Sequence, residues 1–211
     1  MGGPYYDLSL DEQAYLKDLS QEEFQALLVV QRLVAEYKPM LAVELGTFRG
    51  GGAAMIALAM PEGGRVITID NKRYNYPDSQ VGANLKHKDI ARLGLDSKVT
   101  RAIGQSEECD TLIREITDDM VDFCYIDAWH TYESCKNDYL AISKVLAKEH
   151  LVIFDDVNLG QRTNDNGLGT ARGPGDAVFA FIPELFPKYQ YMEYYNACNG
   201  VMACWAKKSN A

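Results

Sequence analysis

Short apolar runs alternate with longer amphipathic segments along the chain from residue 41 to residue 154. The apolar runs predict β-strands at 41–45, 65–70, 98–103, 121–126 and 150–154. The segments between them predict helices near 50–60, 79–94, 106–117 and 132–147. Since buried strands that alternate with helices are typical of a parallel sheet covered on both faces, the pattern indicates an α/β fold.

The N-terminal part of the chain is expected to be helical. Ser20 and Glu23 have the spacing of a capping box, and a helical face follows up to Pro39. The apolar and neutral residues of that face are Phe24, Leu27, Leu28, Gln31, Val34 and Ala35. We therefore expect a helical extension over residues 1–39.

The C-terminal part differs from the alternating region as well. Residues 157–175 are polar and rich in glycine, which predicts a long loop, and a short helix is expected near 175–185. Two closely spaced strands, about 188–195 and 200–206, predict an antiparallel pair at the end of the chain.

Together these elements predict one domain over residues 1–211, with its α/β core in 40–211. The core is expected to be a doubly wound, mostly parallel sheet of seven strands, ending in the antiparallel pair.

Charge and composition narrow the classes of function. The 211 residues include 21 Lys and Arg against 30 Asp and Glu, a formal net charge of −9. This balance argues against a protein that binds nucleic acid or an anionic membrane surface, since both require concentrated basic charge. The five cysteines form no CxxC pair, and no apolar run is long enough to span a membrane. With no signal peptide recognised, we expect reduced thiols and a cytoplasmic location.

Ligands of such sheets bind where the parallel strands end, so the residues after each strand are the candidates for chemistry. The first strand leads through Glu44 into a glycine-rich turn from Gly46 to Gly52. Glycine lets the backbone bend tightly and approach a ligand, and the following helix offers free N–H groups. The turn has neither the GxGxxG fingerprint nor a P-loop, so a pyrophosphate ligand is not favoured. A plain turn remains the alternative.

The second and third strands end in residues that suit an adenosine. Asp70 can accept hydrogen bonds from ribose hydroxyls, although an aspartate at this place can also cap a helix. Gln105, Ser106 and Glu107 follow the third strand, where an adenine would lie. Ser106 could equally cap the next helix.

Three aspartates follow the fourth and fifth strands. Asp127 comes after one, and Asp155 with Asp156 after the other, so neighbouring strand ends about 5 Å apart would bring the carboxylates together. Like charges repel unless a cation neutralises them, and oxygen ligands suit Mg²⁺, Ca²⁺ or Mn²⁺. The alternative is that one aspartate caps a helix and another faces water. His130 could act as a general base or be a surface histidine.

These motifs in this order resemble the class I S-adenosylmethionine-dependent methyltransferases. The residues that carry the resemblance are ELGTFRGG at 44–51, Asp70, GQSEE at 104–108, YIDAWH at 125–130 and FDD at 154–156. Within that family, the chain is most similar to small metal-dependent O-methyltransferases of the catechol, caffeoyl-CoA, macrolide-sugar and aminocoumarin-sugar types. The resemblance covers about residues 40–160.

The resemblance assigns a role to each matching residue. It implies that S-adenosylmethionine is bound by Glu44, Gly46, Thr47, Phe48, Gly50, Gly52, Asp70, Gln105, Ser106, Glu107 and Asp127. It also implies that a divalent metal, Mg²⁺ in first place, is held by Asp127, Asp155 and Asp156. His130 stands where the catechol type has its catalytic lysine, and residues around 72–80 are additional to the catechol type.

The implied reaction is methylation of a hydroxyl on a small molecule, a diol or a catechol-like compound. The metal would orient the hydroxyl and lower its pKa, and His130 or Asp127 would take the proton. The loop 157–175 is expected to cover this site. A homodimer is compatible with the sequence.

Three other interpretations remain open at this stage. A Rossmann-type NAD-dependent oxidoreductase or epimerase would share the glycine turn and Asp70, but it calls for GxGxxG and leaves Asp155 and Asp156 unexplained. A methyltransferase-like domain could bind a cofactor or partner without catalysis. Methylation could also proceed without metal, with His130 as the sole base.

Overall fold

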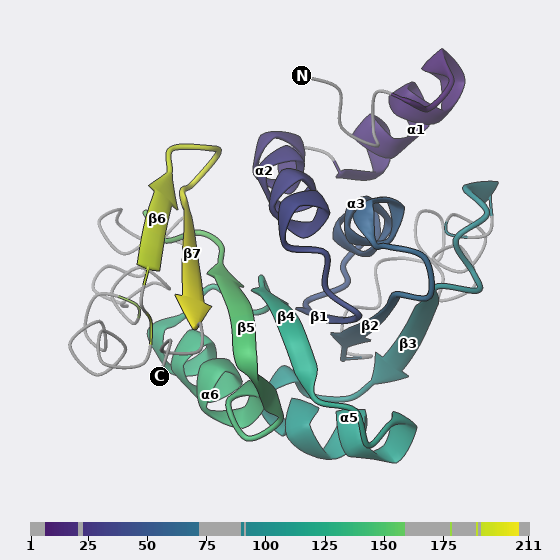
Figure 1. The fold of residues 1–211 in the computed structure, drawn as a ribbon. Coiled ribbons are helices and arrows are strands. Elements are labelled where there is room, and N and C mark those ends of the chain that lie inside the picture. The colour runs from purple at the N-terminus through teal and green to yellow at the C-terminus, as the bar shows by residue number, and fades with distance from the viewer. Residues whose placement is uncertain are drawn as a thin grey trace.

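The computed structural model describes residues 7–20, 23–71, 90, 92–158, 178, 189 and 191–206. Within them a single sheet has the strand order β3-β2-β1-β4-β5-β7-β6 (Figure 1). Its strands are β1 (Leu41–Leu45), β2 (Arg65–Asp70), β3 (Val99–Ile103), β4 (Val121–Ile126), β5 (Leu146–Phe154), β6 (Tyr191–Tyr195) and β7 (Val201–Ala206). The first five strands pair in parallel, whereas β7 runs antiparallel to both β5 and β6. The predicted mostly parallel seven-stranded sheet with its antiparallel pair is confirmed.

Helices cover both faces of this sheet (Figure 1). One face carries α1 (Leu10–Ser20), α2 (Phe24–Tyr37) and α3 (Gly51–Ala59). The other face carries the 3-10 turn η3 (Ser106–Glu108), α5 (Cys109–Ile116) and α6 (Tyr132–Ile142). The side chains of each strand alternate between two separate apolar clusters, one under each helical layer, because successive residues of a strand point to opposite faces. None of the described helices has the length and apolar character to cross a membrane.

The capping box at Ser20 and Glu23 was predicted wrongly. Ser20 is the last residue of α1, and Glu23 is the N-cap of α2 without a side-chain capping bond. A capping box does lie at the start of α1, where the Ser9 N–H donates to Glu12 Oε2 at 2.9 Å and the Glu12 N–H donates to Ser9 Oγ at 3.3 Å. The sequence signal at Ser20 was misleading, because Ser20 still belongs to α1 and α2 begins four residues later, at Phe24, which is buried in the core.

The predicted helix 132–147 is too long, and the predicted strand 150–154 is too short. The helix α6 ends at Ile142, and β5 begins at Leu146. A register irregularity lies in this part of the strand, since Val121 pairs with Leu146 but Phe123 pairs with Leu151. Ala147, Lys148 and Glu149 favour helices in isolation, so the polar start of β5 carries no strand signal.

Several sequence predictions lie outside the described residues. They are the loop 157–175 beyond residue 158, most of the helices 79–94 and 175–185, and the segment 72–80. The division into an extension and a core also stays a prediction.

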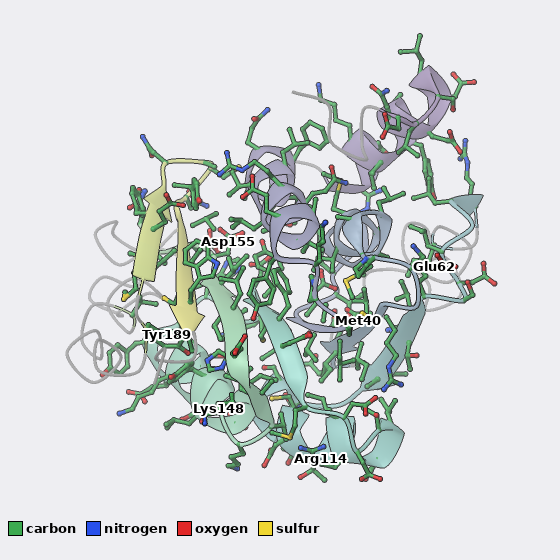
Figure 2. The ribbon with its side chains drawn as sticks, in the orientation of Figure 1. Met40, Glu62, Arg114, Lys148, Asp155 and Tyr189 are labelled. Carbon is green, nitrogen blue, oxygen red and sulfur yellow. The ribbon has the colours of Figure 1, made fainter. Side chains whose placement is uncertain are left out.

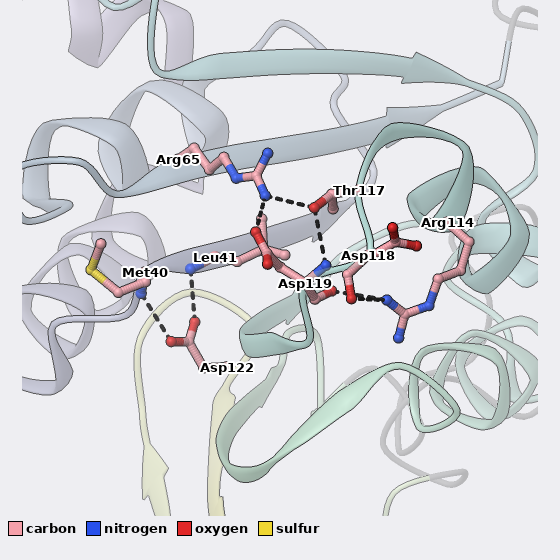
Figure 3. Close-up of polar contacts among 8 residues, drawn as sticks. All are labelled: Met40, Leu41, Arg65, Arg114, Thr117, Asp118, Asp119 and Asp122. Carbon is pink, nitrogen blue, oxygen red and sulfur yellow. Dashed lines mark hydrogen bonds and ion pairs between the residues drawn. The ribbon is translucent and has the colours of Figure 1, made fainter.

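Polar side chains tie the amino ends of the parallel strands together (Figure 3). The carboxylate of Asp122 accepts the backbone N–H groups of Met40 and Leu41, both at 2.9 Å. Arg65 donates to Thr117 Oγ1 at 2.7 Å and pairs with Asp119. These bonds hold the amino ends of the strands together. The carboxyl ends, on the opposite side of the sheet, are where a ligand would bind. Figure 2 shows both ends of β5, with Lys148 near its start and Asp155 beyond its other end.

At the carboxyl edge, backbone hydrogen bonds between neighbouring strands continue beyond the ends of the strands themselves. The Gly46 N–H donates to Ile69 O, and the Asp127 N–H donates to Leu45 O, each at 2.9 Å. A Cβ on Gly46 would lie 1.8 Å from the carbonyl oxygen of Asp127, and Gly46 has φ +102°. Glycine at this position therefore lets the ends of β1 and β4 meet.

We expect Gly46→Ala to destabilise the protein far more than Gly94→Ala. Both glycines have positive φ, but no atom of the described residues lies within 4 Å of a Cβ on Gly94, whose φ is +69°. The control should lose about 1 kcal/mol of unfolding free energy from backbone strain alone. Gly46→Ala adds a clash with rigid backbone and should lose about 4 kcal/mol or more. Urea unfolding of both variants measures the difference, and equal losses would contradict the close approach.

Candidate active site

The glycine-rich turn after β1 is a tight bend. The Gly50 N–H donates to Thr47 O at 2.7 Å, and Gly50 itself has φ +88°. Phe48 also has a positive φ, 42°, and its N–H donates to Asp70 Oδ2 at 2.8 Å. Asp70 thus holds the bend against the end of β2, and the two predicted cofactor elements lie side by side.

Glu44 lies beneath the bend rather than on its surface. Its side chain is 1% exposed and accepts a hydrogen bond from Thr68, whose hydroxyl is also 2.6 Å from Thr47 Oγ1. A Cβ on Gly52 would lie 2.0 Å from Glu44 Oε1. Gly52 is therefore needed for the start of α3 to pack over this buried carboxylate.

The residues predicted to border an adenine lie at the same sheet edge, beyond β3. The Gly104 N–H donates to Asp70 O at 3.1 Å, and Asn71 Nδ2 donates to Gln105 Oε1 at 3.2 Å. Ser106 and Glu107 open the turn η3, where Ser106 is half-buried and Glu107 exposed. Asp70, Gln105 and Ser106 therefore form one continuous border from β2 to β3.

An acidic cluster occupies the ends of β4 and β5. One ligand atom each from Asp127, His130 and Asp156 lies within 4.8 Å of the other two. His130 Nε2 is 3.0 Å from Asp156 Oδ2 and 3.6 Å from Asp127 Oδ1. The imidazole is half exposed, whereas both aspartate side chains are 10% exposed. The strand ends thus bring two of the three predicted metal ligands together with the predicted base.

Asp155, the third predicted metal ligand, has its oxygens in contact with the protein itself. Oδ2 accepts a hydrogen bond from the Tyr125 hydroxyl, and Oδ1 accepts the Asp156 N–H at 2.7 Å. The same Tyr125 hydroxyl lies 3.3 Å from Asp127 Oδ2. Asp156 adopts φ +54°, a left-handed conformation that aspartate tolerates better than most residues. Asp155 therefore braces the cluster through Tyr125.

Burial and mutual repulsion govern the titration of this cluster. Burial raises the pKa of Asp127 well above its usual range, and the His130 contact opposes that rise. Burial, and then the charge of Asp156, raise the pKa of Asp155 to about 7. Contact with Asp127, and then with Asp156, raises the pKa of His130 to about 11. Glu23, at the start of α2, adds to the negative potential at Asp127 and Asp155.

The space at the cluster is small, about 10 Å³. That volume corresponds to about one water molecule. Carboxylate oxygens in such a space are the donor set that Mg²⁺ and Mn²⁺ prefer, so the residues present fit a single hard cation. A larger hollow of about 370 Å³ lies elsewhere, between α2 and the β6–β7 turn, and Arg32 and Cys198 are among its lining residues.

Three residues of this site were given no role from the sequence, although Tyr125 and Trp129 lie within the motif YIDAWH. Tyr125 precedes Asp127 by two positions in β4, so strand periodicity could have placed it on the same side. Trp129 lines the cavity with 55% of its surface exposed. Asp138 also lines the cavity, but it comes from the middle of α6, and no local pattern marks it.

Asp138 is a buried carboxylate, 1% exposed. Ser134 Oγ donates to its Oδ2 at 3.4 Å, and the hydroxyl of Ser106 also stabilises its charge. Burial nevertheless raises the pKa of Asp138 to about 6. Within the described part of the chain, its Oδ1 has no hydrogen-bond partner.

Sequence comparison relates the chain to known methyltransferases. The profile of a family described as a methyltransferase domain matches residues 43–157. Catechol O-methyltransferase of Mus musculus is 28% identical over 102 residues, which are 48% of this chain and 36% of that protein. The transmembrane O-methyltransferase homolog of Mus musculus is 36% identical over 81 residues, 38% of this chain and 29% of that protein. The chain spans about a third of the length of these curated relatives.

Structure comparison finds the same fold in solved O-methyltransferases. The O-methyltransferase from Bacillus cereus in complex with SAH has a TM-score of 0.70 and 17% identity, covering 95% of this chain and 94% of that chain. TomG from Streptomyces achromogenes, an O-methyltransferase of tomaymycin synthesis in complex with SAM, has a TM-score of 0.70 and 16% identity, covering 92% and 90%. At these identities the likeness is one of fold.

We expect Asp138→Asn to alter the pH dependence of stability. Because the pKa of Asp138 in the folded state, about 6, exceeds the ordinary 3.8, its favourable contribution is complete below pH 3.8 and is lost as pH rises through 6. The variant should gain stability relative to the wild type between pH 4 and pH 7, by up to about 3 kcal/mol. Urea unfolding at a series of pH values measures this gain.

The control is Asp96→Asn, a change at an exposed carboxylate. Its unfolding free energy should show the same pH dependence as that of the wild type. If the unfolding free energy of Asp138→Asn also followed the pH dependence of the wild type, burial would not raise the pKa of the Asp138 carboxyl.

Proposed function

The chain belongs to the methyltransferase domain family, and we propose that it is an S-adenosylmethionine-dependent O-methyltransferase acting with a divalent cation, Mg²⁺ in first place. Its acceptor is a small molecule with a hydroxyl group, of the diol or catechol-like class. The observation that carries this proposal is the cluster of Asp127, His130 and Asp156 at the same sheet edge as the glycine bend. The cytoplasmic location and the homodimer stay predictions from the sequence.

The cofactor half of the proposal rests on the bend and the border beside it. Gly50 has φ +88°, and among the described residues the atom nearest to a Cβ at this position would be Ile90 Cδ1 at 4.0 Å, so the bend requires glycine for its backbone conformation. Asp70 keeps a carboxylate at the end of β2, where a ribose would lie, and Gln105 and Ser106 continue the border toward a nucleobase. Bound S-adenosylmethionine supplies an activated methyl group on a sulfonium.

The metal half rests on charge and donor chemistry. Asp127 and Asp156 present carboxylates that repel each other, and the cavity between the neighbouring side chains has room for one ion. Asp127 and Asp156 would hold the cation directly, while Asp155 would join as a ligand or keep bracing the site through Tyr125. The cation, when bound, lowers the pKa of the acceptor hydroxyl and offsets the charge of the carboxylates.

The protein's own side chains would then position the acceptor and receive its proton. Asp127 belongs to the acidic cluster, and its backbone adjoins Gly46 of the glycine bend, so a hydroxyl bound at the cluster would be near the methyl donor. Proximity supplies much of the rate gain. Asp127 or His130 would take the proton. Trp129, exposed at the rim, would exclude water from one side of the acceptor.

The open alternatives fit this geometry less well. For metal-free catalysis by His130 alone, contact with Asp127 and then with Asp156 raises the pKa of the imidazole to about 11, so without a cation at the carboxylates His130 is protonated near neutral pH and is a poor base. A non-catalytic domain would not require two carboxylates held against their repulsion. A nicotinamide dinucleotide would call for the GxGxxG turn, which the bend after β1 lacks.

Cofactor choice can be measured by thermal unfolding with S-adenosylhomocysteine or NADH. At 100 times its dissociation constant a ligand adds about 2.7 kcal/mol, which should raise Tm by roughly 5–10 °C for S-adenosylhomocysteine. NADH should leave Tm unchanged, and Asp70→Ala should abolish the shift while the control Asp96→Asn keeps it. Stabilisation by NADH instead would overturn the proposed cofactor.

Metal dependence can be measured by methyl transfer to a catechol probe, with and without EDTA. Asp127→Asn and Asp156→Asn should each lower kcat/KM by about 100-fold or more, because each removes a carboxylate from the cation site. Calorimetric titration with Mg²⁺ should show binding to the wild type and to Asp96→Asn only. Full activity of the wild type in EDTA would exclude the metal and leave the metal-free route.

A further inference from the structure

The hollow of about 370 Å³ between α2 and the β6–β7 turn has no part in the reaction steps proposed above. Its volume lies in the range of small-molecule sites, about 300–1,000 Å³. The space at the acidic cluster, about 10 Å³, holds one ion, so the body of an acceptor must lie outside it. Apolar and polar side chains line the hollow together: Leu28, Val29 and Ala197, with Gln25, Arg32 and Asn196. Such a lining suits a molecule with an apolar body and a polar group.

The hollow lies at the same edge of the sheet as the acidic cluster. The Val157 N–H donates to Gly200 O at 3.1 Å, and the Asn158 N–H donates to Asn199 O at 2.7 Å. These bonds join the β6–β7 turn to the chain that leaves Asp156, and two residues of chain span at most about 7 Å. The turn lies beside α2 (Figure 1). An acceptor whose hydroxyls are at the cluster can therefore extend toward the hollow.

Arg32 is the one charged side chain among the described residues that line the hollow. Its Nη2 donates to the Tyr195 hydroxyl at 3.2 Å, and its Cζ lies 5.3 Å from the centre of the Tyr195 ring. Its Nε is 3.6 Å from Glu36 Oε1, in an exposed ion pair that water weakens. Within the described part of the chain, Nη1 makes no hydrogen bond or ion pair. The guanidinium is thus held in place, with Nη1 able to contact a ligand.

The ligand that this arrangement favours is an organic acid. A guanidinium only donates hydrogen bonds, and its N–H groups pair best with a carboxylate or another acidic oxygen. Because Tyr195 already holds Arg32, little side-chain entropy is lost when the acid binds. Leu28 and Val29 are half-buried and would cover the apolar body of the ligand.

We propose that the hollow receives the distal part of the acceptor and that Arg32 pairs with an acidic group there, so that the enzyme prefers acidic diols to neutral ones. This inference rests on the proposed function, since it concerns the acceptor of the same reaction. Arg32 is then a specificity-determining residue. It contributes to binding of the acceptor and not to the chemical step, so its loss should raise KM and leave kcat unchanged.

The test compares methyl transfer to 4-(3,4-dihydroxyphenyl)butanoate and to its neutral amide, with Mg²⁺ present. Because the two probes share one body, the ratio of their kcat/KM values reports the acidic group alone. The wild type should prefer the acid about fivefold or more, the value of one accessible charge-assisted hydrogen bond. Arg32→Gln should raise the KM of the acid, leave kcat unchanged and bring the ratio to about one.

Arg92→Gln is the matched control and should keep the wild-type ratio. Arg92 also lies over a tyrosine ring, with its Cζ 4.0 Å from the centre of Tyr15, but it is not among the residues that line the hollow. A ratio in Arg32→Gln equal to that of the wild type would overturn the inference.

A second measurement locates the acid in the wild-type protein without methyl transfer. Cys198 lines the hollow and is exposed, whereas the other four cysteines are buried. A saturating concentration of the acid should slow alkylation of Cys198 by iodoacetamide several-fold, because the bound acid covers the thiol. Unchanged alkylation at saturation would also overturn the inference. Absence of methyl transfer to both probes, together with absence of S-adenosylhomocysteine binding, would instead refute the proposed function.

Discussion

Electrostatic repulsion between Asp127 and Asp156 is the constraint around which the carboxyl edge of the sheet is organised. Two largely buried carboxylates within 4.8 Å of each other require a compensating positive charge or a proton. In this structure His130 supplies that charge from the rim, at 3.0 Å from Asp156. Tyr125 and the Asp156 N–H satisfy Asp155 beside them. The fold thus holds the carboxylates together through these contacts.

The carboxyl ends of the strands also bring the carboxylates of Asp127 and Asp156 next to the glycine bend. Gly46 allows the ends of β1 and β4 to touch, since any side chain there would strike the carbonyl of Asp127. Asp70 ties the bend to β2 through the Phe48 N–H. The two halves of the proposed site are therefore fixed relative to one another by backbone contacts, which suits a reaction that depends on alignment of two reactants.

The sequence predicted the parallel strands well, because strands such as β1 and β4 are largely buried and mostly apolar, with one acidic residue each, Glu44 and Asp122. It failed where polar residues enter a strand, at the start of β5, and where two helices compete for a boundary, at Ser20. Convergence of Asp127 with Asp156 followed from the rule on strand ends. The turning of Asp155 toward Tyr125 and the burial of Asp138 depend on three-dimensional packing, and no spacing in the sequence encodes them.

The most direct measurement of the central claim is anomalous diffraction from crystals soaked with Mn²⁺ and S-adenosylhomocysteine. Mn²⁺ takes the same oxygen ligands as Mg²⁺ and scatters anomalously. The account predicts one anomalous peak within coordination distance of the Asp127 and Asp156 carboxylates, with His130 displaced from between them and the nucleoside beside the glycine bend. A cluster that stays paired with His130 and free of Mn²⁺ at saturating concentration would contradict it.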